Sequence, residues 1–307
     1  MAAKKRKRAP RQVYAFIDTN IFLDFYRDSN EATLSLLERL KPVRDRVIST
    51  YQVEMEFLKN RQRVLVESLS KVKIQNPPTI PAILADSATS KSLRDVIEEA
   101  SKKADRIRAR IINLLKNPSQ KDVVYQSLEY VFQSDSEHVL TRDMAIRQQI
   151  KRRAWRRFIL GYPPRKQTDT SIGDALNWEW IVHCGQNIPG KIVIVSRDSD
   201  YGSSVRKEYF LNDQLLREYR DRVGAGKSIG YTHKLSDALQ ELQVKVPQKE
   251  IEAEAESMED REREALAQDL PAASRNRIGH ISFEEFLRLL KGRSLDAHSP
   301  ATVESDA

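Results

Sequence analysis

Two aspartates each follow a short apolar run of the sequence closely. Asp18 comes directly after residues 13–17, and Asp198 comes just after residues 191–196. Both runs are rich in β-branched and aromatic residues, which predicts buried strands of a parallel sheet. The carboxyl ends of parallel strands meet at one edge of a sheet, where functional groups collect. We therefore expect Asp18 and Asp198 to share one site.

Two further acids are expected to complete this site. Glu56 lies a few residues after a second strand, predicted near residues 47–49, and Asp174 lies in the first turn of a helix predicted over 173–184. Four carboxylates in one cleft would repel and raise one another's pKa unless a cation lies among them. Oxygen ligands without histidine or cysteine point to Mg²⁺ or Mn²⁺. Such ions activate water and neutralise a phosphodiester, so hydrolysis of nucleic acid is the predicted chemistry.

A single aspartate after a strand is more often a helix cap or a solvated turn residue. The prediction therefore depends on the order and placement of all four acids together.

Four segments in order resemble PIN domains, in the large PIN-like form first described only as a domain of unknown function. The segments are residues 16–20 (FIDTN), 49–61 (STYQVEMEFLKNR), 172–178 (IGDALNW, shortly after PPRK at 163–166) and 194–201 (IVSRDSDY). The likeness extends over about residues 13–245. It implies a three-layer α/β/α fold with a central, mostly parallel sheet, and a divalent-metal nuclease site that usually acts on RNA.

The resemblance also assigns individual positions. Its metal-binding and catalytic acids would be Asp18, Glu56, Asp174 and Asp198. Asp200 would be an outer acid that acts through water. Glu54 is a rival to Glu56, but residues two apart lie about 200° around a helix and cannot share a face.

Three nearby residues are expected to have supporting roles, and one position departs from the PIN pattern. Thr19 would cap the helix after Asp18, and Asn20 would brace that loop. Arg61 would reach the acids or a substrate phosphate, or else be a surface ion-pair partner. Arg197 stands where relatives often have another acid, which puts a second metal ion in doubt.

The remaining pattern predicts an α/β domain with a helical insertion. Helices are expected over residues 30–40, 53–64 and 212–222, and a closing strand over 242–246. The predicted divisions are a flexible basic arm (1–12), a nuclease domain (13–247, with the insertion at about 64–160), and a largely disordered acidic linker with a short amphipathic helix at 281–290 (248–307). Within the last division, residues 250–269 resemble either a solvated helix or a disordered linker. That last helix could bind a partner or support a homo-oligomer.

The formal charge of +8 favours a polyanionic partner such as a nucleic acid. The resemblance to PIN domains implies RNA ahead of DNA. A basic segment could hold the phosphate backbone, with Trp155 or Phe158 stacking on bases. Its candidate residues are Arg147, Lys151, Arg152 and Arg156, followed by Arg165 and Lys166. The alternative is a solvated helix whose aromatic residues pack into the core.

Other classes are disfavoured. The single cysteine cannot form a disulfide within the chain, and no phosphate-binding or dinucleotide loop is present. No apolar run is long enough to cross a bilayer, so we expect a soluble, cytoplasmic protein. Three functions stay open: a Mg²⁺- or Mn²⁺-dependent endonuclease, a catalytically weak PIN-like nucleic-acid-binding or regulatory module, and a toxin-like ribonuclease.

Overall fold

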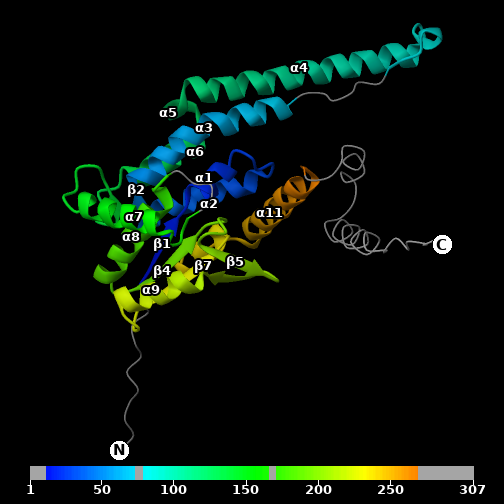
Figure 1. The fold of residues 1–307 in the computed structure, drawn as a ribbon. Coiled ribbons are helices and arrows are strands. Elements are labelled where there is room, and N and C mark those ends of the chain that lie inside the picture. The colour runs from blue at the N-terminus through cyan, green and yellow to red at the C-terminus, as the bar shows by residue number, and fades with distance from the viewer. Residues whose placement is uncertain (1–11, 73–78, 166–170, 269–307) are drawn as a thin grey trace, which may run out of the picture. The chain divides into compact units, whose positions relative to one another are not determined.

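The computed structural model describes residues 12–72, 79–165 and 171–268 (Figure 1). The chain forms two compact units that divide between Ile251 and Glu252. The basic arm predicted over residues 1–12, apart from Gln12, and the helix predicted at 281–290 lie outside the described residues. Along the described residues, no helix is both long and apolar enough to cross a membrane.

A five-stranded parallel sheet forms the centre of the first unit, in the order β3-β2-β1-β4-β7. These strands are β1 (Val13–Ile17), β2 (Val47–Thr50), β3 (Val139–Leu140), β4 (Lys191–Val195) and β7 (Ser228–Thr232). A separate antiparallel hairpin joins β5 (Gly202–Val205) to β6 (Glu208–Leu211). The predicted α/β class and parallel sheet are confirmed.

The register of the two central strands sets the position of the site. Ile17 of β1 pairs with Val195 of β4, and the backbone amide of Asp18 donates to the carbonyl of Val195 at 2.9 Å. Both strands are buried along nearly their whole length, which explains their continuous apolar sequences. Because the strands end in step, the residues that follow them leave the sheet at the same edge.

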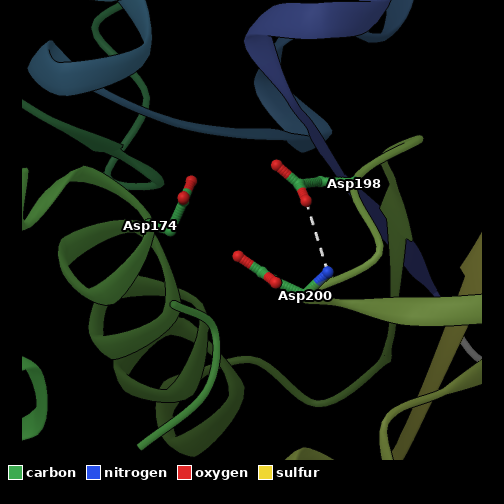
Figure 2. Close-up of side chains that lie close together, drawn as sticks. All are labelled: Asp174, Asp198 and Asp200. Atoms are coloured by element: carbon green, nitrogen blue, oxygen red, sulfur yellow. Dashed lines mark hydrogen bonds between the residues drawn. The ribbon is translucent and has the colours of Figure 1, made fainter. Parts of the chain in front are cut away.

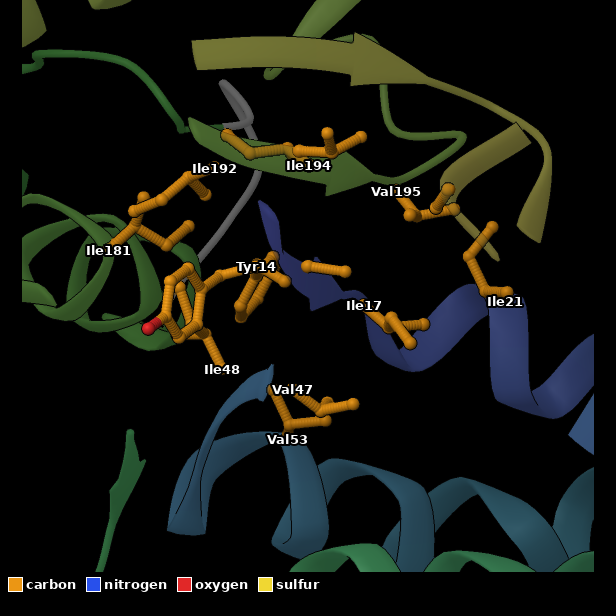
Figure 3. Packing of buried hydrophobic residues seen from close by; sticks show 14 of the residues in the cluster. Tyr14, Ile17, Ile21, Val47, Ile48, Val53, Ile181, Ile192, Ile194 and Val195 are labelled. Atoms are coloured by element: carbon orange, nitrogen blue, oxygen red, sulfur yellow. The ribbon is translucent and has the colours of Figure 1, made fainter. Parts of the chain in front are cut away.

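Helices cover both faces of the sheet and give three layers. Helix α8 (Gly173–Asn187) packs against β2 and β4, and α10 (Leu235–Glu241) packs against β1, β4 and β7. Ile181 of α8 lies beside Tyr14 and Ile192 in the core (Figure 3). The other α-helices are α1 (Thr19–Asp24), α2 (Leu34–Leu40), α3 (Tyr51–Lys71), α4 (Ala88–Lys116), α5 (Pro118–Lys121), α6 (Val123–Phe132), α7 (Arg147–Leu160), α9 (Asp213–Val223) and α11 (Gln248–Gln268). Short 3₁₀ helices cover Glu31–Thr33, Lys41–Arg46 and Ala82–Leu84.

The strand predicted over 242–246 is wrong, and the closing strand is β7. The backbone amide of Val244 donates back to the carbonyl of Leu239 at 2.9 Å, and Gln243 has a φ of 63°. These residues therefore form the C-terminal turn of α10 and are not available to a ladder. β7 is partly exposed along its first half and contains Gly230, so its sequence lacks the apolar run of β1 or β4.

The predicted insertion of about 64–160 is too long at its C-terminal end. Helices α3 and α4 extend side by side away from the sheet (Figure 1). The residues after α5 return to the domain, because Leu128, Leu140 and Ala154 are fully buried in the main core. Residues 248–268 form helix α11, in agreement with the helical alternative for the acidic stretch and not with the disordered one.

Arg61 attaches the extended helices to the domain. Its guanidinium donates to Asp122 Oδ2 at 2.6 and 2.8 Å and to the carbonyl of Leu114 at 2.7 Å. Both charged side chains are buried, with 4 % and 2 % of their surface exposed. The predictions that Arg61 reaches the acidic site or lies on the surface are both wrong, because Asp122 holds it inside.

We expect Arg61→Met to lower the free energy of unfolding by about 3–5 kcal/mol, because it leaves the buried carboxylate of Asp122 without its cation. The control is Arg63→Met, two residues along the same helix. Arg63 pairs with Glu67 on the exposed face, so its replacement should cost less than about 0.5 kcal/mol. Urea denaturation measures both values, and equal losses would contradict the role of the buried pair.

Candidate active site

Three aspartates meet beyond the carboxyl ends of the central strands (Figure 2). Asp174 lies in the first turn of α8, while Asp198 and Asp200 lie in the loop after β4. Each offers a carboxylate oxygen within 4.8 Å of those of the other two. The backbone amide of Asp200 donates to Asp198 Oδ1 at 3.3 Å, which fixes the loop between them. We call these three residues the aspartate triad.

Asp18 is buried behind the triad and is held by neutral groups. Its Oδ1 accepts from the amide of Thr19 at 2.7 Å, and its Oδ2 accepts from Asn20 Nδ2 at 2.8 Å and from Ser196 Oγ at 2.6 Å. Ser196 Oγ in turn accepts from the amide of Asp198 at 3.0 Å. Ser196 therefore connects Asp18 to the triad. Ser196 was not among the predicted site residues, although it follows a strand just as Asp18 does.

Glu56 of α3 adjoins the start of α8. Its Oε1 accepts from Gln52 Nε2 at 2.8 Å, one helical turn earlier, and its Oε2 accepts from Thr19 Oγ1 at 3.4 Å. A side-chain carbon added at Gly173 would collide with Glu56 Oε1. Gly173 thus allows the carboxylate of Glu56 to approach the turn that carries Asp174. Gln52 was also missed, and its signal was the four-residue spacing from Glu56.

A buried tyrosine lies near all four predicted acids. Tyr201 is 0 % exposed. Burial raises the pKa of its phenol, and nearby carboxylates raise it further, namely those of Asp174, Asp18, Glu56 and Asp198. Its hydroxyl has no hydrogen-bond partner among the described residues. A buried hydroxyl without a protein partner, beside several carboxylates, fits a site that takes up water or an ion.

Burial and repulsion act directly on Asp18. Burial raises its pKa, and the charges of Glu56 and Asp198 add to this effect against hydrogen bonds from Ser196 and Thr19. The resulting pKa is about 6, compared with 3.8 for an ordinary aspartate. A divalent cation nearby would remove the repulsion. The all-oxygen donor set of the triad fits a hard divalent cation.

The residue that caps α1 differs from the one predicted. Thr19 does not cap α1; Asp18 does, because its backbone is extended and its side chain accepts from the amide of Thr19. Asp200, predicted to belong to the metal site as an outer acid, is one of the three closely spaced aspartates. Asp18 and Glu56 lie beside this triad and are not part of it.

Arg197 has a definite partner at the same edge of the sheet. Its guanidinium forms an ion pair with Asp24 at the end of α1, and its backbone amide donates to Asn20 Oδ1 at 3.4 Å. Arg197 stands where relatives often have an acid. Its side chain therefore pairs an aspartate of α1 with the loop after β4.

The predicted nucleic-acid-binding residues lie on and after α7. Lys151, Arg152 and Arg156 are exposed, and the guanidinium of Arg147 lies 5.9 Å from the ring centroid of Tyr51. Trp155 is 46 % exposed, so it does not pack into the core as the alternative predicted.

Two predicted cations follow α7. Arg165 packs over the ring of Phe158 at 4.4 Å and donates to the carbonyl of Phe158 at 2.7 Å. Lys166 lies outside the described residues.

The raised pKa of Asp18 predicts a pH dependence of stability in protein stripped of metal. The unfolded chain loses this proton near pH 4 and the folded chain near pH 6, so the contribution of Asp18 to stability falls as the pH rises between these values. Asp18→Asn removes the effect and should stabilise the metal-free protein at pH 7.5 by about 1–3 kcal/mol. Thermal unfolding in EDTA at pH 4 and pH 7.5 measures this, with Asp95→Asn on α4 as control. A loss of stability in Asp18→Asn at pH 7.5 would contradict the assignment.

Comparison with known families agrees with this geometry. The PIN domain family profile matches residues 15–201, which is more than half of the chain and includes all five acids. Searches among curated proteins and among solved structures gave no match. PIN domains are generally nucleases that use divalent metal ions, and the resemblance predicted from the four acidic segments is confirmed at this level. The chain belongs to the PIN domain family.

Proposed function

We propose that this protein is an endonuclease that uses Mg²⁺ or Mn²⁺ to hydrolyse phosphodiester bonds of RNA. The observation that carries the proposal is the aspartate triad, whose oxygens lie within 4.8 Å of one another at the edge where Asp18 and Glu56 also end. Family membership supports the nuclease class. The choice of RNA over DNA rests on the likeness of the four segments to their PIN-like relatives.

In the proposed reaction some residues would bind the cation and others would orient them. Asp174, Asp198 and Asp200 would hold the cation, which supplies charge neutralisation and an activated water when bound. Asp18 is too buried to touch a substrate, so it would orient Asp198 through Ser196. Partners of this kind fix the orientation of metal-binding groups.

The α7 surface would hold the strand. Helix α7 carries six cations and no acid. Lys151, Arg152 and Arg156 form no ion pair within the described part of the chain, so their charges are available to phosphates. Such contacts are electrostatic and do not depend on sequence.

A second candidate is a PIN-like module that binds RNA without cleaving it. The pair between Arg197 and Asp24 favours this candidate, because it places a cation where many relatives have an acid. Cleavage assays with and without Mn²⁺ separate the two functions, since only the endonuclease converts bound RNA to product.

Asp198→Asn should reduce metal-dependent RNA cleavage by at least about a hundredfold, because even outer-shell partners of metal ligands are worth about 10- to 100-fold. The matched control is Asp95→Asn, an exposed aspartate of α4 outside the site. Cleavage of labelled RNA and of DNA of the same sequence, in Mg²⁺, Mn²⁺ or EDTA, is the measurement. Full activity of Asp198→Asn would refute the site, and preferred cleavage of DNA would refute the choice of substrate.

Lys151→Gln/Arg152→Gln should weaken RNA binding and make it less sensitive to salt. Loss of two phosphate contacts lowers the slope of log affinity against log salt concentration by about 1.4 for a single strand. Fluorescence anisotropy over a range of KCl concentrations gives this slope. Lys91→Gln/Arg94→Gln on α4 removes the same charge elsewhere and should leave the slope unchanged. An equal change in both variants would indicate an effect of net charge alone.

A further inference from the structure

An open pocket of about 440 Å³ lies between α7, α8 and α9. Helix α8 packs against both α7 and α9. Its volume falls within the range of small-molecule sites, about 300–1,000 Å³. The aspartate triad does not line it.

The floor of the pocket is a neutral network of two arginines and two glutamates. Arg222 donates to Glu179 at 2.6 and 2.9 Å and to Glu218 at 2.6 Å, and Arg157 pairs with the same two glutamates. Although burial opposes ionisation of Glu179, its pKa is lowered by hydrogen bonds and charges of Arg222 and Arg157. Four mutually bridged side chains form a rigid base, with Arg157 and Glu179 each 4 % exposed.

The rim of the pocket is positively charged. Arg153 and Arg156 line it from α7, and neither forms an ion pair within the described ranges. Arg153 lies one turn before Arg157, whose buried ion pairs fix the orientation of this face of the helix. The balance of the whole pocket is four arginines against two glutamates, so it favours an anion.

Apolar surface completes the rim. Tyr162 and Leu160 line the pocket and are 46 % and 52 % exposed. An exposed aromatic ring beside unpaired guanidinium groups matches the two parts of a nucleotide. Guanidinium groups bind phosphate through charge-assisted hydrogen bonds, and aromatic rings stack on bases.

Helix α8 also relates this pocket to the triad. Glu179 in the floor follows Asp174 by five residues, which is about 7.5 Å along the helix axis. Five residues also correspond to about 140° around the axis, so Asp174 and Glu179 lie on different faces of α8.

We propose that this pocket binds one nucleotide of single-stranded RNA, with the phosphate on Arg153 and Arg156 and the base against Tyr162. The choice of an RNA strand rests on the proposed function, whereas the nucleotide site rests on the pocket alone.

Calorimetric titration of the full chain in EDTA with adenosine 5′-monophosphate, adenosine and inorganic phosphate tests the site without catalysis. The nucleotide should bind at least about tenfold more tightly than either part. Arg153→Gln/Arg156→Gln and Tyr162→Ala should each weaken its binding by about tenfold or more. The control Lys91→Gln/Arg94→Gln should bind as the wild type does. Wild-type affinity in both pocket variants, or no nucleotide binding at all, overturns the site.

Anisotropy with a short single-stranded RNA in EDTA tests the strand. The same two variants should lose affinity for it, and unchanged RNA affinity in variants that no longer bind the nucleotide overturns the assignment to RNA. Failure of the proposed function is distinguishable, because a protein that never cleaves RNA can still show these losses.

Discussion

Repulsion among carboxylates at one edge of the sheet is the constraint around which this domain is arranged. β1 and β4 end in step, so Asp18 and Asp198 leave the sheet together, and α3 and α8 bring Glu56 and Asp174 to the same place. The cost is visible in the pKa of Asp18, which rises to about 6. A fold that keeps such a group ionised near neutral pH is destabilised by it unless a cation binds. A cation bound at this edge would therefore also stabilise the folded state.

Other buried charged side chains of the domain are neutralised by ion pairs. Arg61 is matched by Asp122, and the two arginines below the α7–α8–α9 pocket are matched by two glutamates. Asp18, in contrast, is held by a hydroxyl, an amide side chain and a backbone amide, all of them neutral. Neutral donors orient a carboxylate without cancelling its charge. Asp18 therefore differs from the buried charges that are neutralised by an ion pair.

The sequence predicts those elements whose conformation depends on the local pattern of residues. β1 and β4 could be predicted because strands buried on both faces need continuous apolar residues. The acids that follow them could be placed at one edge because the strands are parallel. β7 and the hairpin β5–β6 could not, since their residues are half-exposed and owe their conformation to neighbouring strands. The same limit explains the errors at Arg61 and Thr19. Which partner holds an arginine, which of two adjacent residues caps a helix, and which acid comes closest are decided by tertiary contacts across the chain.

One helix links the two sites proposed for the strand. Asp174 begins α8 and Glu179 lies in the pocket floor, so the distance between triad and pocket is set by a helix whose middle is fully buried, with Trp178 0 % exposed. No hinge separates them along the helix. A nucleotide held in the pocket would therefore place the strand at a fixed distance from the triad. The α7 cations can hold phosphates at any position, because backbone contacts carry no sequence information. The α7 surface would then supply affinity for any sequence, while the pocket would hold one nucleotide in a fixed place.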